Sequence, residues 1–146
     1  MDGTIPRREL PRVLGAIARM SARYGLRVAN VFHAGDGNLH PLILYDANRP
    51  DELERAEAFG AEILKLCVDV GGVLTGEHGV GLEKRDLMPY QFGTVDLSVQ
   101  RRLKEAFDPD GRFNPGKVFP LLHRCAEDGR MHVHRGAERF PELPRF

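Results

Sequence analysis

The stretch VANVFHAGDGNLHPLILY, residues 28–45, decides the fold of this chain. Two runs within it, Val28–His33 and Leu39–Tyr45, are rich in β-branched and large apolar residues, as strands are. The segment between them, Ala34–Asn38, carries glycine on both sides of an aspartate, which is typical of a turn. The pattern therefore predicts an antiparallel hairpin closed by a tight two-residue turn.

Helical periodicity flanks the hairpin on both sides. Apolar residues recur at three- and four-residue steps over residues 9–24 and again over residues 51–70, and glycines follow both segments. A third long helix is expected over residues 95–107. Between the second and third long helices we expect a strand over residues 73–75 and a short helix over residues 82–88, stopped by Pro89. Four residues of the third long helix are expected to face inward: Val99, Leu103, Ala106 and Phe107.

Length and composition narrow the class of protein. The chain has 146 residues, enough to bury the core of one domain. Twenty-one basic residues balance 21 acidic ones, so charge gives no reason to expect nucleic acid or an anionic membrane as partner. The two cysteines lack CxxC spacing, and no apolar run approaches the roughly 20 residues that cross a bilayer. No signal-peptide pattern opens the sequence, so we expect a cytoplasmic protein without a membrane span.

The hairpin carries a pair of histidines. If Asp36 and Gly37 occupy the centre of the turn, His33 stands directly opposite His40 on the same face of the sheet. Two imidazoles about 4.5–5.5 Å apart at Cβ can bind one metal ion. The alternative is that both are ordinary polar residues at strand ends.

A second motif, Gly76-Glu77-His78-Gly79, places a carboxylate and an imidazole in a glycine-rich loop. Glu77 could complete a site of two histidines and one carboxylate, which suits catalytic zinc and also iron or manganese. His78 is then a candidate catalytic base, because imidazole exchanges protons near neutral pH. The alternative is a glycine-rich surface turn with incidental charge.

A third motif, Phe113-Asn114-Pro115-Gly116-Lys117, follows the third long helix. Asn114 and Lys117 can hydrogen-bond the edge of a cofactor or an anionic group, although an ordinary turn is the simpler interpretation. Neither a GxGxxG sequence after a strand nor a GxxxxGK[ST] sequence is present. The sequence thus predicts no phosphate-binding loop.

The motifs occur together and in one order: HAGDGNLHP at residues 33–41, GEHGVG at residues 76–81, then FDP at residues 107–109 with NPGK at residues 114–117. In this order they resemble the C-terminal, substrate-capping domain of FAD-linked 2-hydroxy acid oxidases and dehydrogenases of the vanillyl-alcohol-oxidase type. The tail RCAEDGRMHVH, residues 124–134, also resembles the ending of the FAD-linked subunits of bacterial glycolate oxidases.

The resemblance implies roles for five residues. In family members that hold a metal, the positions of His33, His40 and Glu77 are the ligands, His78 contacts the substrate and is the proposed base, and Asn114 lies near the flavin. The substrate is a small 2-hydroxy acid, such as glycolate or D-lactate, which becomes a 2-oxo acid as hydride passes to FAD. Relatives that take hydroxyglutarate carry Asn two residues after the second histidine. Leu42 stands there in this chain, which implies a smaller or less polar substrate.

The resemblance also implies what lies outside the chain. Relatives bind FAD mainly through an N-terminal domain that these 146 residues do not include, so the chain alone is expected to be inactive and to work with that domain or with other oxidase subunits. Residues 1–122 correspond to the cap domain and residues 123–146 to an irregular tail.

The expected fold class is α+β: an antiparallel sheet with helices packed on one face, part of a ferredoxin-like domain. An exposed sheet edge would favour a homo-oligomer. Two other functions stay open from sequence: a flavin-independent metalloenzyme with the same two-histidine, one-carboxylate site, and a non-catalytic interaction fragment.

Overall fold

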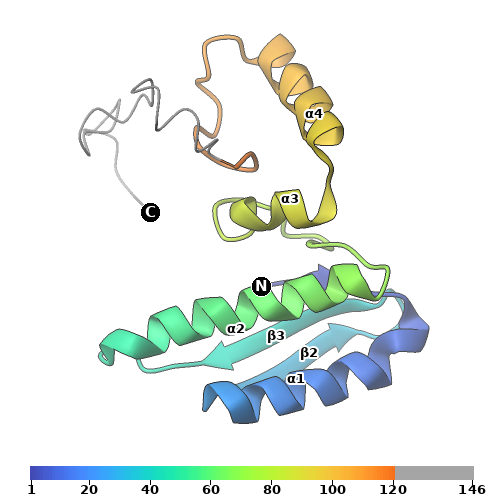
Figure 1. Ribbon diagram of the computed structural model, residues 1–146, viewed down its shortest axis with the longest axis vertical. Coiled ribbons are helices and arrows are strands. Elements are labelled where there is room, and N and C mark those ends of the chain that lie inside the picture. The colour runs from blue at the N-terminus through green and yellow to red at the C-terminus, as the bar shows by residue number, and fades with distance from the viewer. Residues whose placement is uncertain (121–146) are drawn as a thin grey trace.

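The computed structural model describes residues 1–120, and the predicted tail with its boundary at residue 122 lies outside them. Within this part the chain forms a small sheet and a series of helices (Figure 1). The elements are β1 (Gly3–Thr4), η1 (Arg7–Glu9), α1 (Leu10–Tyr24), β2 (Arg27–His33), β3 (Asn38–Leu44), α2 (Pro50–Asp69), η2 (Arg85–Leu87), α3 (Met88–Gln91) and α4 (Thr94–Phe107).

The three strands lie in the order β1-β3-β2, and both strand pairs are antiparallel. Val73 adds one antiparallel bridge to Thr4, on the outer side of β1. Read with α1 and α2 between the strands, this is the β-α-β-β-α-β arrangement of ferredoxin-like folds, with its first strand reduced to two residues and its last to one bridge. The predicted α+β class is confirmed, and β2 forms one edge of the sheet.

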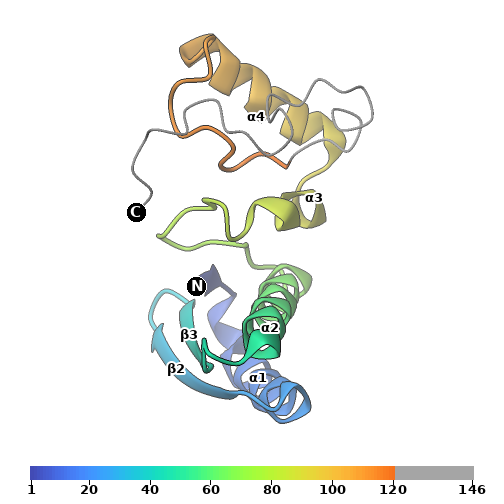
Figure 2. The same cartoon turned by 90° about the vertical axis from the view of Figure 1, so that its left-hand side faces the viewer.

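Helices α1 and α2 cover a single face of the sheet (Figure 2), as the sequence predicts. Val13 and Ile17 lie one helical turn apart on α1, and both are fully buried against Phe59 and Ile63 of α2. Tyr24, in the last turn of α1, stacks on Phe59 with ring centroids 5.2 Å apart. This core holds the hairpin from behind and leaves its other face open.

A second, smaller cluster joins α2 to α3 through Leu64, Leu74 and Met88. The predicted helix over residues 82–88 is wrong, because turns and the short η2 occupy this segment and the helix α3 begins at Met88. Pro89 stands in the first turn of α3 and therefore opens a helix instead of stopping one.

The predicted orientation of α4 is also wrong. Val99, Leu103 and Phe107 are 51%, 61% and 80% exposed, and Ala106 is exposed with them. The opposite side of the helix makes the contacts instead: Arg101 donates to the carbonyl of Pro120 at 3.2 Å, and Lys104 to that of Phe113 at 2.8 Å. The segment that follows α4 thus binds its polar side. No helix within residues 1–120 combines the length and the apolar character that crossing a membrane requires.

Candidate active site and metal centre

The hairpin brings His33 and His40 to one face, although by a different turn from the predicted one. His40 pairs with Val31 and His33 with Asn38, so residues 34–37 form a four-residue connection. Two hydrogen bonds set the wider turn. The N–H of Asp36 donates to the carbonyl of His33 at 3.0 Å, and the N–H of Ile5 donates to the carbonyl of Gly37 at 2.9 Å. The predicted pairing of His33 with His40 is therefore wrong.

His33 and His40 nevertheless lie on the same face of the sheet. The observed pairing differs from the predicted one by two residues, and side chains alternate with a period of two, so both histidines keep the same face. Their rings meet edge to face with centroids 5.3 Å apart. The strands thus place two imidazoles together on the face that no helix covers.

Glu77 reaches the two histidines from the loop after α2. Its Oε1 lies 3.0 Å from Nε2 of His40 and 3.9 Å from Nε2 of His33. His78 joins them, with its Nε2 3.7 Å from the same oxygen and its ring centroid 5.0 Å from that of His40. The structure therefore brings together four of the five predicted site residues around one carboxylate oxygen.

Three of these groups fit a divalent metal. One donor atom each from His33, His40 and Glu77 lie within 4.8 Å of one another, against about 3.3 Å between neighbouring ligands of a tetrahedral zinc ion with bonds of about 2 Å. His40 has its Nε2 buried without an aligned hydrogen-bond partner among the described residues, despite its short distance to Glu77. A buried nitrogen lone pair that faces a carboxylate and a second imidazole is a suitable metal ligand.

The loop that carries Glu77 and His78 closes on a carboxylate that sequence reasoning missed. Asp2 is fully buried and accepts the backbone N–H groups of Gly76, Glu77 and His78 at 2.6, 2.7 and 3.1 Å. Lys84, 1% exposed, donates to the other oxygen of Asp2. No local pattern could have revealed this contact, because 74 to 82 residues separate Asp2 from these partners.

Burial opposes ionisation of Asp2, but its partners outweigh burial. The ammonium of Lys84 and the three N–H groups together hold the pKa of the Asp2 carboxyl well below its ordinary value. Asp2 is therefore an anion at neutral pH and attracts the loop by charge-assisted hydrogen bonds, which are stronger than neutral ones.

Gly76 allows the loop to approach the sheet. A Cβ at this position would lie 2.3 Å from Oδ1 of Asn38 and 2.6 Å from Oγ1 of Thr4, both below any contact that carbon makes with oxygen. Asn38 begins β3, two residues before His40. The glycine thus lets the backbone next to Glu77 touch the strand that carries His40.

The third predicted motif lies beside this loop. The N–H of Val118 donates to the carbonyl of Gly81 at 2.9 Å, and Arg85 donates to the carbonyl of Gly116 at 3.0 Å. Asn114 itself has a positive φ of 47°, and its Oδ1 accepts from Lys117 at 3.4 Å. The Asn114 side chain is therefore occupied by its own turn, and contact with a flavin stays a prediction.

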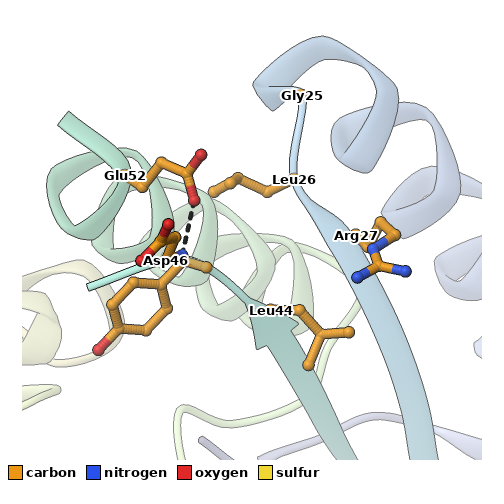
Figure 3. Close-up of a pocket in the computed structure, with 7 residues that line it drawn as sticks. Gly25, Leu26, Arg27, Leu44, Asp46 and Glu52 are labelled. Carbon is orange, nitrogen blue, oxygen red and sulfur yellow. Dashed lines mark hydrogen bonds between the residues drawn. The ribbon is translucent and has the colours of Figure 1, made fainter. Parts of the chain in front are cut away.

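A surface pocket of about 330 Å³ lies at the opposite end of the hairpin, where β2 begins and β3 ends (Figure 3). The Glu52 carboxylate in its wall accepts the N–H of Asp46 at 2.7 Å and pairs with Arg49 at 3.2 Å. Arg27 at this pocket and His33 stand at opposite ends of β2. The pocket is thus separate from the histidine cluster, and its carboxylate is already paired.

Comparison with known proteins matches this chain to one family of FAD-linked oxidases. Residues 1–118 match the family described as FAD linked oxidases, C-terminal domain. The chain is 63% identical over all 146 residues to the glycolate oxidase subunit GlcD of Escherichia coli strain K12, and it covers 29% of that protein. It is 39% identical over 132 residues, 90% of the chain, to the glycolate oxidase subunit GlcD of Bacillus subtilis strain 168, and covers 27% of it.

A third relative carries a different name. The chain is 36% identical over 120 residues, 82% of its length, to the mitochondrial D-lactate dehydrogenase (cytochrome) of Kluyveromyces lactis, and covers 20% of that protein. The chain therefore spans less than a third of the length of these relatives. The match over residues 1–118, with identity along the whole chain, shows that this protein belongs to the family of FAD-linked oxidase C-terminal domains.

Proposed function

We propose that this chain forms the substrate side of an FAD-linked oxidoreductase that converts a small 2-hydroxy acid, of the glycolate or D-lactate type, to the 2-oxo acid. The observation that carries the proposal is the cluster of three imidazole Nε2 atoms, at 3.0, 3.7 and 3.9 Å, around Oε1 of Glu77. The names of the relatives support the substrate class, because two are glycolate oxidase subunits and one is a D-lactate dehydrogenase.

His33, His40 and Glu77 would hold a divalent metal, with zinc the first choice and iron or manganese also suited to the donor set. When bound, such an ion acts as a Lewis acid that lowers the pKa of a coordinated hydroxyl. The exposed fractions support access of substrate: the side chains of His33 and Glu77 are 58% and 53% exposed, whereas His40 is 12% exposed. His40 would anchor the site, and the other two would leave room for a ligand.

His78 is the proposed base. Its side chain is 55% exposed, and its Nε2 stands 3.7 Å from the Glu77 oxygen, so it can reach a hydroxyl held at the cluster. Transfer of the hydroxyl proton to His78, with loss of the α-hydrogen as a hydride, turns the hydroxy acid into the oxo acid. When bound, a flavin supplies the hydride acceptor. The described residues contain no phosphate-binding loop for FAD, so we propose only a single flavin contact on this chain, from Asn114.

The neighbours of His40 support a substrate that is smaller or less polar than hydroxyglutarate. Val31 pairs with His40 across the strands, Leu42 lies two residues further along β3 on the same face, and they are 53% and 48% exposed. A second carboxylate on a substrate would meet these apolar side chains and lose hydration without a polar partner.

We further propose that an FAD-binding domain and other oxidase subunits complete the enzyme. Two relatives are named as subunits of glycolate oxidase, and the chain covers 29% and 27% of them. The edge of β2 would supply the contact for such a partner or for a second copy of the chain.

The metal assignment is tested with His33→Ala and Glu77→Gln, made in this chain and in the chain joined to the FAD-binding part of such an enzyme. Both variants should lose zinc, measured by competition with a chromophoric chelator, and the joined enzyme should lose turnover of glycolate and D-lactate. Glu83→Gln is the matched control, because Glu83 is exposed and lies six residues beyond Glu77. Full zinc affinity and turnover in either site variant would overturn the assignment.

A further inference from the structure

Asp2 is the most deeply buried charged residue near the candidate site, and none of the roles proposed above includes it. Its exposed fraction is zero, and that of its partner Lys84 is 1%. Asp2 stands next to β1, which lies between β3 and the Val73 bridge. The carboxylate is therefore attached to the sheet, on the side where the Glu77 loop meets it.

The loop wraps this carboxylate with consecutive amides. Three successive backbone N–H groups, from Gly76, Glu77 and His78, point at the single oxygen Oδ2, and the Thr75 hydroxyl adds contacts to both oxygens at 3.2 and 3.3 Å. Consecutive N–H groups that converge in this way form a concave binding site for an anion. Here the anion is a side chain of the same protein, which turns the site into a fixed attachment point.

We infer that Asp2 and Lys84 form a positioning pair that fixes the backbone of Glu77 and His78 against the sheet, so that both side chains meet His33 and His40. This inference rests on the proposed function only for the measurement of zinc affinity; loop exchange and ring shifts test it independently. Lys84 balances the charge of Asp2 inside the protein and keeps the carboxylate ionised. Nδ1 of His78 also lies 3.8 Å from Oδ1 of Asp2, so the pair borders the His78 ring as well as its backbone.

The test removes the pair without leaving a lone buried charge. Asp2→Ala alone would strand the Lys84 ammonium in the interior, which can unfold the chain. We therefore choose the double variant Asp2→Ala/Lys84→Met, with Asp2→Asn/Lys84→Met as a milder form that keeps one acceptor oxygen for the loop amides. The milder form also serves if the first does not fold.

A second carboxylate, buried but paired with a lysine whose side chain is 35% exposed, supplies the matched control. Asp108, 6% exposed, accepts the N–H groups of Arg112 and Phe113 and pairs with Lys104, in a turn beyond α4. Asp108→Ala/Lys104→Met removes the same chemistry from a turn that carries no proposed metal ligand. Any general effect of losing a buried carboxylate together with its lysine partner appears in both double variants.

Three measurements follow on the isotopically labelled chain: hydrogen exchange of the three loop amides, the ring-proton shifts of His40 and His78, and zinc affinity. In Asp2→Ala/Lys84→Met we expect loop amides to exchange at least about tenfold faster and zinc to bind about 10–100-fold more weakly, the usual range for groups that orient metal ligands. The milder variant should fall between this variant and the unmodified chain. The Asp108 control should keep its zinc affinity.

The inference is overturned if a folded Asp2 variant keeps its loop-amide protection, its histidine ring shifts and its zinc affinity within about twofold. A different result separates it from the proposed function. If the unmodified chain binds no zinc, the metal assignment fails, and faster loop exchange with altered His40 and His78 ring shifts still supports the positioning role. Ring shifts are informative because the two rings lie 5.0 Å apart, where each ring's field acts on the other.

Discussion

Replacing Gly76 with alanine tests whether the approach of the Glu77 loop to the sheet builds the site. The new Cβ would lie 2.3 Å from Oδ1 of Asn38 and 2.6 Å from Oγ1 of Thr4, whereas ordinary contacts begin at 3.4 Å. The loop or its neighbours must therefore move by about 1 Å. Asn38 is 7% exposed and Thr4 is β-branched, so neither side chain can turn away cheaply.

The displacement has two measurable consequences. Forcing an extra carbon into a packed contact should lower the free energy of unfolding by about 1–3 kcal/mol, measured by urea denaturation. A shift of Glu77 by about 1 Å also exceeds the tolerance of about 0.2 Å in metal–ligand distances, so zinc affinity, measured by chelator competition, should fall at least about tenfold.

Gly35→Ala is the matched control, since it also adds one methyl group near the site. A Cβ at Gly35 meets nothing within 4 Å, so this variant should keep its zinc affinity and gain up to about 1 kcal/mol from a stiffer unfolded chain. The reasoning is refuted if Gly76→Ala binds zinc as tightly as the unmodified chain, or if Gly35→Ala weakens zinc binding to the same extent.

Two further predictions concern buried groups. Burial raises the pKa of the Cys67 thiol to about 12. In a Cys125→Ser variant, a disulfide reagent at pH 8 should therefore label Cys67 only after unfolding in guanidinium chloride. Rapid labelling of the folded protein would contradict this. The hydrogen bond from Lys104 outweighs burial and holds the pKa of Asp108 below its ordinary value of 3.8, so its stabilising effect is complete above that pH and is lost on further acidification. Urea midpoints should thus fall below about pH 4, and Asp108→Asn should lower the midpoint at pH 7 while making that fall shallower.

The histidine pair could be predicted from sequence because its position depends on local features. Two apolar runs and a turn predict a hairpin. Any shift of the strand pairing by an even number of residues leaves His33 and His40 on one face. The turn length could not be predicted from the hairpin alone, since one of the two hydrogen bonds that set it joins Ile5 to Gly37, which are far apart in the chain. Strand periodicity thus predicted the face of the two histidines correctly. The predicted pairing was wrong because a distant contact widens the turn.

The same distinction explains what sequence reasoning missed. Asp2 shows no helical or strand pattern, and the residues that bind it follow 74 to 82 positions later, so nothing near it in the chain indicates its role. On α4, periodicity correctly predicted a helix but assigned the wrong side inward. Its apolar stripe, which includes Leu103 at 61% exposure, stays largely exposed within residues 1–120, and its polar side binds the following segment.

The two halves of the candidate site differ in how firmly the fold holds them. His33 and His40 stand on paired strands backed by the α1–α2 core, whereas Glu77 and His78 stand on a loop fixed through Asp2. Changes that loosen the loop should therefore weaken metal binding before they affect the fold.

Exposure separates metal binding from catalysis in this chain. Three of the four cluster side chains, those of His33, Glu77 and His78, are more than half exposed, so water reaches the atoms that would hold a substrate. Binding of the proposed metal depends on the geometry and the protonation of its ligands, and the three proposed ligands all belong to this chain. Hydride transfer, in contrast, requires a site closed to water, in which charges act at low dielectric and the acceptor lies against the substrate. Under the proposed function, a surface outside residues 1–120 would have to cover the site. It follows that zinc binding should be measurable on the isolated chain, while oxidation of the 2-hydroxy acid should require the FAD-binding domain.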